Sequence, residues 1–312
     1  GNGLGGAFVI NRITPTTSAA ITGVSGALTT VSVWGGTVAV LADGSRITEY
    51  DDLIAGRQSL SATDASQVDF SGRSVNNGTA NPDGAAVLAI ASLIQIGRNN
   101  AGVALLDNTV AQSHLASIDF ANVSASGRIS VVAQDGATLT GVAIGLGAAT
   151  GQFAGTASVV LQSIENVARA HIGGAGTRIA GGIVEVTSTG SSAIRGAAGS
   201  LGLGFGAAAL GLSVVENNIA NEIKAEIEDA QLTASSDLVL RANSTATIDT
   251  LAVGIAMSRN VGLAGSVANN SVATDVGATI TGADIVAGNN LGVFATNSDK
   301  ITVSAGALGV TV

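Results

Sequence analysis

Apolar and polar residues alternate with a period of two over long stretches of this chain, the pattern of a half-exposed β-strand. In the segment 221–229, Ile223, Ala225 and Ile227 are predicted to face the interior, and the charged residues between them to face water. No stretch sustains the 3.6-residue period of a helix. The runs end at DG, GG, GNN or SS turn signals, so we expect an all-β protein.

The strand pattern recurs along the chain. A strand-opening apolar residue appears at Ile47, Leu139, Ile194, Ile248 and Ile301. The steps are 92, 55, 54 and 53 residues, and the first of them is one period plus an insertion. Two further series agree with this spacing, an apolar residue usually followed by Ala (Ile13, Val110, Val167, Ile219, Val272) and a strand-ending residue (Ala42, Ala133, Thr187, Ala242, Ala295). Self-similarity at such a period predicts a parallel β-solenoid with coils about 4.8 Å apart. One wide coil per repeat and two coils of about 27 residues are both compatible with it.

The repeats divide the chain into one continuous solenoid with a single interruption. We expect a partial repeat at 1–47, an insertion at 48–83, repeats at 84–138, 139–193, 194–247 and 248–300, and the start of another at 301–312. Because both ends fall within a repeat, we expect the chain to be a segment of a longer array.

Composition narrows the class of protein. The 312 residues include 43 Gly and only 2 Pro, with 3% aromatic and 11% charged residues. A mean hydropathy of +0.48 excludes ordinary disorder, so the apolar side chains must be buried. The net charge of −9, without any run of Lys or Arg, argues against nucleic acid as a partner. The absence of Cys removes disulfides, thiolate metal sites and cysteine nucleophiles.

The first half of each repeat is rich in Gly and Ala and nearly free of charge. In the run from Leu201, large residues alternate strictly with Gly, which favours a strand and argues against a membrane-spanning helix. If Leu201, Leu203 and Phe205 point one way, the glycines leave the opposite surface flat, and another backbone layer can approach closely. That layer is either internal or a neighbouring molecule, in which case the flat face is a lateral or adhesive surface.

Asparagines stand two residues before the members of the second series, except before Val167, where Glu165 holds that place and Asn166 is beside it. Stacked coils would align them in a structural ladder of hydrogen-bonded amides, and the alternative is a polar binding groove. The predicted ladder consists of Asn11, Asn108, Asn166, Asn217 and Asn270.

Two histidines, His114 and His171, are predicted to share one register position with Ile223 and Val276. Stacked histidines could ligate a metal, but no third ligand occurs at a defined spacing, which favours histidines in the core or at a bend and no metal site.

The insertion carries the best candidates for binding or chemistry, which are Tyr50, Asp51, Asp52, Asp64 and Asp69. Paired carboxylates could act on a sugar as acid and base, or hold calcium. However, adjacent Asp residues on a strand point to opposite faces, aromatic platforms for sugar are scarce, and no catalytic or calcium-binding motif occurs. We therefore expect no enzyme and no cofactor, with calcium as the alternative.

Units such as LAVGIAMSRNVGLAGSVANNSVATDVGATITGADIVAGNN resemble the repeats of very large bacterial filamentous adhesins, the filamentous-haemagglutinin-like exoproteins of two-partner secretion and related autotransporter passengers. The resemblance covers nearly the whole chain except residues 48–83. It implies a right-handed β-solenoid shaft, an extracellular or bacterial cell-surface location, and a role in adhesion or biofilm. It provides no catalytic residues.

The expected function is therefore a structural and adhesive repeat segment. Its expected partners are other copies of itself or flanking repeats, with host or surface glycans or proteins as further ones. The alternatives are a β-helix carbohydrate-active enzyme and a receptor-binding module, both using the insertion.

Overall fold

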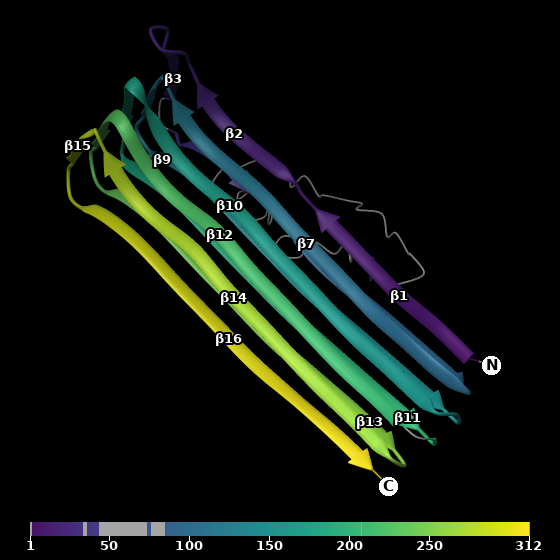
Figure 1. The fold of residues 1–312 in the computed structure, drawn as a ribbon. Coiled ribbons are helices and arrows are strands. Elements are labelled where there is room, and N and C mark those ends of the chain that lie inside the picture. The colour runs from purple at the N-terminus through teal and green to yellow at the C-terminus, as the bar shows by residue number, and fades with distance from the viewer. Residues whose placement is uncertain (1, 34–35, 44–73, 76–84, 207, 312) are drawn as a thin grey trace.

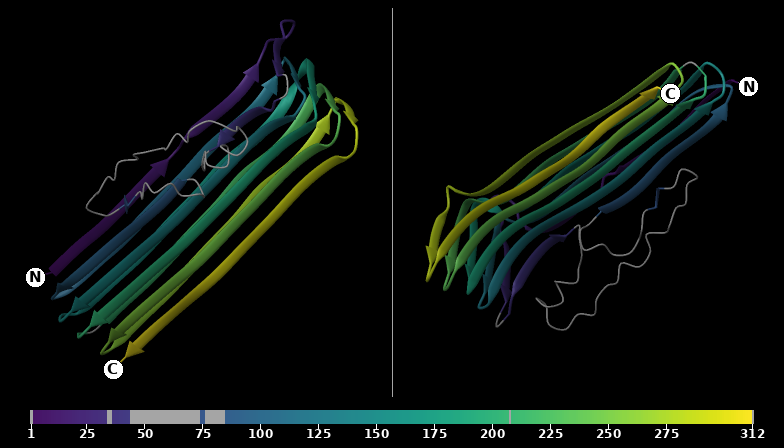
Figure 2. Two further views of the ribbon diagram at one scale, coloured as in Figure 1. Left: turned by 180° about the vertical axis from the view of Figure 1, so that it is seen from behind. Right: turned by 90° about the horizontal axis from the view of Figure 1, so that it is seen from below.

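The protein is a two-layered β-solenoid. This computed structural model describes residues 2–33, 36–43, 74–75, 85–206 and 208–311. Within these ranges every regular element is a β-strand, and all but one of the pairings between the named strands are parallel. The strands lie side by side in two long layers, and the chain passes from one layer to the other at each end (Figure 1, Figure 2). The all-β parallel solenoid predicted from the sequence is confirmed.

The first sheet has five main rows. In spatial order its long strands are β1 (Asn2–Ile13), β7 (Asn99–Asp119), β10 (Phe153–Gly181), β12 (Ala208–Ala234) and β14 (Val261–Thr281). Four short strands complete the sheet: β2 (Thr16–Thr22), β3 (Thr29–Val33), β8 (Ala121–Ala125) and β15 (Asp284–Ala287).

The second sheet faces the first. Its long strands, in spatial order, are β16 (Leu291–Thr311), β13 (Leu238–Ser258), β11 (Ile183–Gly204), β9 (Arg128–Ala149) and β6 (Ala85–Gly97). The short β4 (Val38–Asp43) pairs with β9, and β5 (Ser74–Val75) lies antiparallel on β6.

One turn of the solenoid is one wide coil with a long strand in each sheet. Asn100 pairs with Ala154, 54 residues later, and Ala208 pairs with Val261, 53 residues later. Coils of half that length are therefore ruled out for these strands. The wide coil explains the flat outline of the molecule, because each turn contains two nearly straight runs (Figure 2).

The register supports the first of the three sequence series at every member that the structure describes, and Ile47 lies outside the described residues. The strand-opening residues Leu139, Ile194, Ile248 and Ile301 pair directly with one another, row to row. They stack because each occupies an inward position of the same sheet.

The other two series each contain one misplaced member. Ile164, not Val167, pairs with Val110 and Ile219. The motif of an apolar residue followed by Ala predicted the wrong position. The residue after Ile164 points outward, so the fold does not require an alanine there.

In the third series Ser188, not Thr187, pairs with Ala133 and Ala242. A slip of one residue along a strand exchanges the inner and outer faces, and Ser188 is the buried one.

The charged half of each coil is built as the alternation predicts. Ile223, Ala225 and Ile227 are buried, and the acidic and basic residues between them point outward. Several of these charges pair between neighbouring coils, as in Lys224 with Asp275, whose Nζ and Oδ1 lie 2.5 Å apart. Such exposed pairs each contribute about 0 to 1 kcal/mol, so the buried alternation holds this half together.

The Gly and Ala half brings the two sheets into backbone contact. Gly202 faces inward, and a Cβ added there would lie 2.5 Å from the carbonyl oxygen of Leu210 in the opposite sheet. At Gly211 an added Cβ would overlap the carbonyl oxygen of Ile255. The layer that approaches the flat glycine surface is therefore the other sheet of the same chain.

This arrangement determines which side chains form the outer surface. The bare glycine face is interior, and Leu201, Leu203 and Phe205 point away from the core, with Phe205 61% exposed. At Gly202 and Gly204 the backbone of the opposite sheet leaves no room for a side chain, so the large apolar residues next to them lie on the outside.

Candidate functional site

An amide ladder runs along the solenoid, inside the slab. Its members pair row to row and are Asn11, Asn108, Gln162, Asn217 and Asn270. The Nδ2 of Asn11 donates to Oδ1 of Asn108 at 2.8 Å, and the Nδ2 of Asn217 donates to Oδ1 of Asn270 at 2.9 Å. When the side-chain amide of Gln162 is oriented so that its oxygen and its nitrogen both have partners, the nitrogen donates to Oδ1 of Asn217 at 3.2 Å.

The ladder has a structural role. Asn108 and Asn217 are buried between the sheets, so neither lines a groove that a ligand could enter. The room for these side chains comes from the facing strands, where a Cβ on Gly141 or Gly196 would collide with Gln162 or Asn217. Four of the five predicted members are in the ladder, with Gln162 in the remaining place.

Asn166 belongs to a different row, four residues further along the strand. It pairs with Gln112 and Asn221, and all three side chains are buried. Its Nδ2 donates to Oδ2 of Asp135 in the opposite sheet at 2.5 Å. Asn221 likewise reaches across, donating to Oγ of Ser192 at 3.0 Å. We call this row and its cross-sheet partners the polar seam.

The polar seam separates two apolar clusters of the core. Ile164 lies in one cluster and Ala168 in the other, and Asn166 stands between them on the same strand. In the facing strand Asp135 stands between Ala133 and Ala137, which again belong to different clusters. Buried amides and a carboxylate need specific partners, so the seam fixes how the two sheets face each other.

His114 joins the polar seam. Its Nε2 lies 3.3 Å from Oδ1 of Asp135, with the two side chains 1% and 0% exposed. Neither ring nitrogen makes a well-aligned hydrogen bond, so proximity to the carboxylate is the main polar contact. A pair this deeply buried cannot reach a substrate in solution.

The two histidines do not share a register position. His114 pairs with Ala168, whereas His171 pairs with Ser117 and lies 3.7 Å from Asp119. The prediction of stacked histidines is wrong. It used the alignment on Val167, which lies three residues from the position that pairs with the other members of its series. Among the residues that the structure describes, no group of three His, Cys, Asp or Glu side chains could hold a metal ion.

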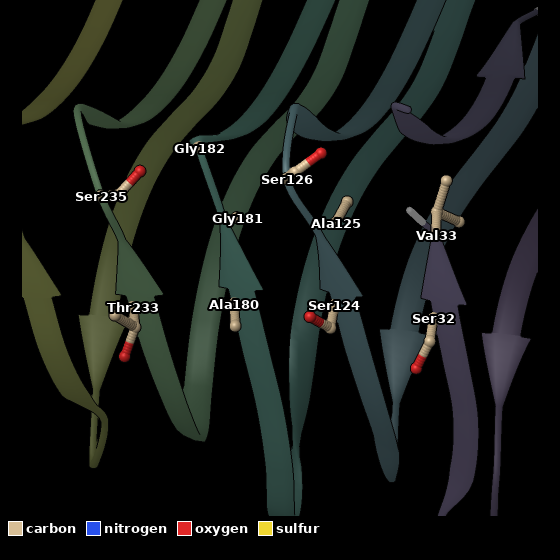
Figure 3. A pocket seen from close by; sticks show the side chains of 10 residues that line it. All are labelled: Ser32, Val33, Ser124, Ala125, Ser126, Ala180, Gly181, Gly182, Thr233 and Ser235. Carbon is tan, nitrogen blue, oxygen red and sulfur yellow. The ribbon is translucent and has the colours of Figure 1, made fainter. Parts of the chain in front are cut away.

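A groove of about 380 Å³ crosses the ends of the first-sheet strands, where the chain turns into the second sheet. Ser32, Ser124 and Thr233 show their hydroxyl groups on one side of it, and Gly181 and Gly182 leave the backbone bare (Figure 3). None of the residues that line it is acidic or aromatic. They are Ser32, Val33, Ser124, Ala125, Ser126, Ala180, Gly181, Gly182, Thr233 and Ser235.

The groove can therefore offer hydroxyl and backbone hydrogen bonds, but no acid–base pair for sugar chemistry. No family model, curated protein or solved structure matches this chain.

The candidates in the insertion lie outside the described residues. Tyr50, Asp51, Asp52, Asp64 and Asp69 therefore remain predictions, as do the calcium site and the sugar site that they would form. Across the described ranges, no segment forms the long apolar helix that would cross a membrane.

The second sheet carries an apolar surface whose side the sequence left open. We define the outer apolar face as the outward residues of 88–96, 140–148, 195–203, 249–257 and 302–310. Its most regular row consists of Ile94, Leu146, Leu201, Ile255 and Leu308, which pair strand to strand. Ile94 is 69% exposed and Leu308 55% exposed. Contiguous apolar surface of this kind marks an interaction site.

Proposed function

We propose that this chain is a structural and adhesive repeat segment of a bacterial filamentous adhesin, located on the cell surface or outside the cell. The observation that supports this most is the continuous parallel pairing of long strands from β1 to β14 in one sheet and from β6 to β16 in the other. In such a stack each coil contacts only its neighbours, so coils can be added without changing the cross-section. A rigid shaft is the direct consequence.

The free edge formed by β14 and β16 is suited to another coil. Each of these strands pairs with a long strand on one side only. Val272 and Val276 face inward there but are only partly buried, and Nδ2 of Asn270 is buried without a hydrogen-bond partner. A further coil, from flanking repeats or from another copy, would cover the valines and extend the amide ladder.

The adhesive part of the proposal rests on the surfaces. The hydroxyl-lined groove repeats similar groups from coil to coil, as expected for contact with surface glycans or proteins. We propose a non-catalytic role, because the groove lacks carboxylates and the His114–Asp135 pair is buried. The resemblance to two-partner-secretion adhesins supports export and a role in biofilm.

Negative-stain electron microscopy tests the shaft directly. The native material and the purified chain are imaged side by side. We expect long fibres in the native material, with the width of one solenoid or of two solenoids packed face to face. Native particles that are short and isolated, or fibres with an unrelated cross-section, would contradict the proposal.

A further inference from the structure

The outer apolar face has a relief that repeats from strand to strand. Next to the Ile94–Leu308 row runs a row made of Ser92, Ile144, Gly199, Val253 and Gly306. Small and large residues alternate along it. A Cβ added at Gly199 or Gly306 would meet no atom within 4 Å, so both positions are open depressions.

We propose that the outer apolar face binds a second copy of this chain, related by a two-fold axis that runs parallel to the strands between β11 and β13. Such an axis exchanges β11 with β13 and β9 with β16. It brings each row of the face opposite the same row of the partner, with the order of strands reversed. Two-fold symmetry requires a self-complementary surface, and this face satisfies that requirement.

The row that contains Gly199 and Gly306 is complementary to the same row of the partner subunit, because the order of strands is reversed there. Gly199 comes opposite Val253 of the partner subunit, and Ile144 comes opposite Gly306 of the partner subunit. Large side chains thus enter the depressions left by glycines. Packing of this kind gives interfaces the density of a protein interior.

Two other rows each contain a further pair of a small and a large residue. Ala197 comes opposite Leu251 of the partner subunit, and Ala148 comes opposite Val310 of the partner subunit. At the border of the face, Arg195 comes opposite Asp249 of the partner subunit, so the charges are complementary as well. In the opposite register, with β11 facing β11, Gly199 would face glycine and Arg195 would face arginine.

The size of the face is sufficient for a weak specific dimer. Four strands about 4.8 Å apart, each contributing nine residues at about 3.3 Å, cover roughly 600 Å² per copy. Two copies would bury about 1,200 Å², the lower limit of stable protein interfaces. Two sheets in face-to-face contact pack about 10 Å apart with aligned strands, as this symmetry requires.

Analytical ultracentrifugation of the purified chain over a range of concentrations tests the dimer. We expect a monomer–dimer equilibrium, and a Gly199→Leu variant with the dimer weakened at least tenfold, because the depression opposite Val253 is filled. The monomer can accept this leucine, since the site is open. The matched control is Gly3→Leu, an equally open glycine on β1, which should leave the dimer unchanged.

A charge exchange tests the register. Arg195→Asp should weaken the dimer, and the double variant Arg195→Asp with Asp249→Arg should restore it, with circular dichroism confirming the fold. A wild-type chain that stays monomeric at every concentration would overturn the proposal. So would stronger association of Gly199→Leu, which would indicate an unspecific apolar surface such as one for lipid. Either result leaves the shaft proposal untouched, because the fibres are examined separately.

Discussion

Asp135 of β9 accepts a hydrogen bond from Nδ2 of Asn166 of β10, and so connects the two sheets through the middle of the core. The contact lies in the polar seam between two apolar clusters. Gln112, in its satisfied orientation, also donates to Oδ1 of Asp135 at 2.6 Å, and His114 lies against the same oxygen. One fully buried carboxylate therefore organises side chains from two neighbouring coils of the opposite sheet.

Removing this carboxylate should destabilise the solenoid strongly. Asp135→Ala leaves Nδ2 of Asn166 buried without its acceptor and removes one of the two acceptors of the Gln112 amide, and we expect a loss of about 3 kcal/mol in the free energy of unfolding. Urea denaturation followed by circular dichroism measures it. The control is Asp284→Ala at an exposed site on β15, expected to change stability by less than about 0.5 kcal/mol. Equal effects of the two substitutions would show that the polar seam is not a stabilising element.

Because the backbones of the two sheets lie so close at some positions, Gly211 and Gly199 should differ sharply in whether they tolerate a larger side chain. At Gly211 a methyl group would overlap the carbonyl oxygen of Ile255, so Gly211→Ala should cost about 1–3 kcal/mol through overpacking. Gly199→Ala, where no atom lies within 4 Å, should be neutral or slightly stabilising. The thermal unfolding midpoints of the two variants make the comparison. A midpoint for Gly211→Ala equal to that of the wild type would mean that the sheets are further apart than described.

The amide ladder should carry a measurable share of stability near the free edge. The Nδ2 of Asn217 donates to Oγ1 of Thr250 and to Oδ1 of Asn270, so Asn217→Leu removes both bonds and leaves Oδ1 of Asn270 with only the bond from Oγ1 of Thr250. We expect a loss of about 2 kcal/mol and faster amide hydrogen exchange in β14. Asn269→Leu, on the outward face beside the ladder, is the matched control and should leave exchange in β14 unchanged. If both variants exchange alike, the ladder does not hold the last coil.

The sequence alone supports the architecture because alternation and spacing follow directly from strand geometry. The row of Leu139, Ile194 and Ile248 could be predicted, since each is a large apolar residue at the same point of its coil. Gln162 could not be assigned to the amide ladder in the same way, because Asn166 lies nearby and matches the residue type of the other members. Only the pairing register distinguishes the two positions.

No local sequence pattern predicts which side chains make contact between the two sheets. His114 and Asp135 lie on different strands of different sheets, and no spacing rule brings them together. The direction of the Leu201–Gly202 alternation is similarly ambiguous. Hydrophobicity alone favours leucine inside, whereas the narrow gap between the backbones places glycine there. Which side of a strand is interior thus depends on the distance between layers.

A strained bend offers a way to stabilise the solenoid. Asp229 follows Glu228 at the bend of β12 and has φ of 49°, in the left-handed region that favours glycine. The next coil has Gly282 in the corresponding place, after Thr281, with φ of 63°. Asp229→Gly should therefore raise the free energy of unfolding by up to about 1 kcal/mol, as relief of strain exceeds the added entropy of the unfolded chain. Asp229→Val should lower stability, because a β-branched residue tolerates this conformation least. Urea midpoints that fall for both variants would mean that the aspartate side chain itself stabilises the bend.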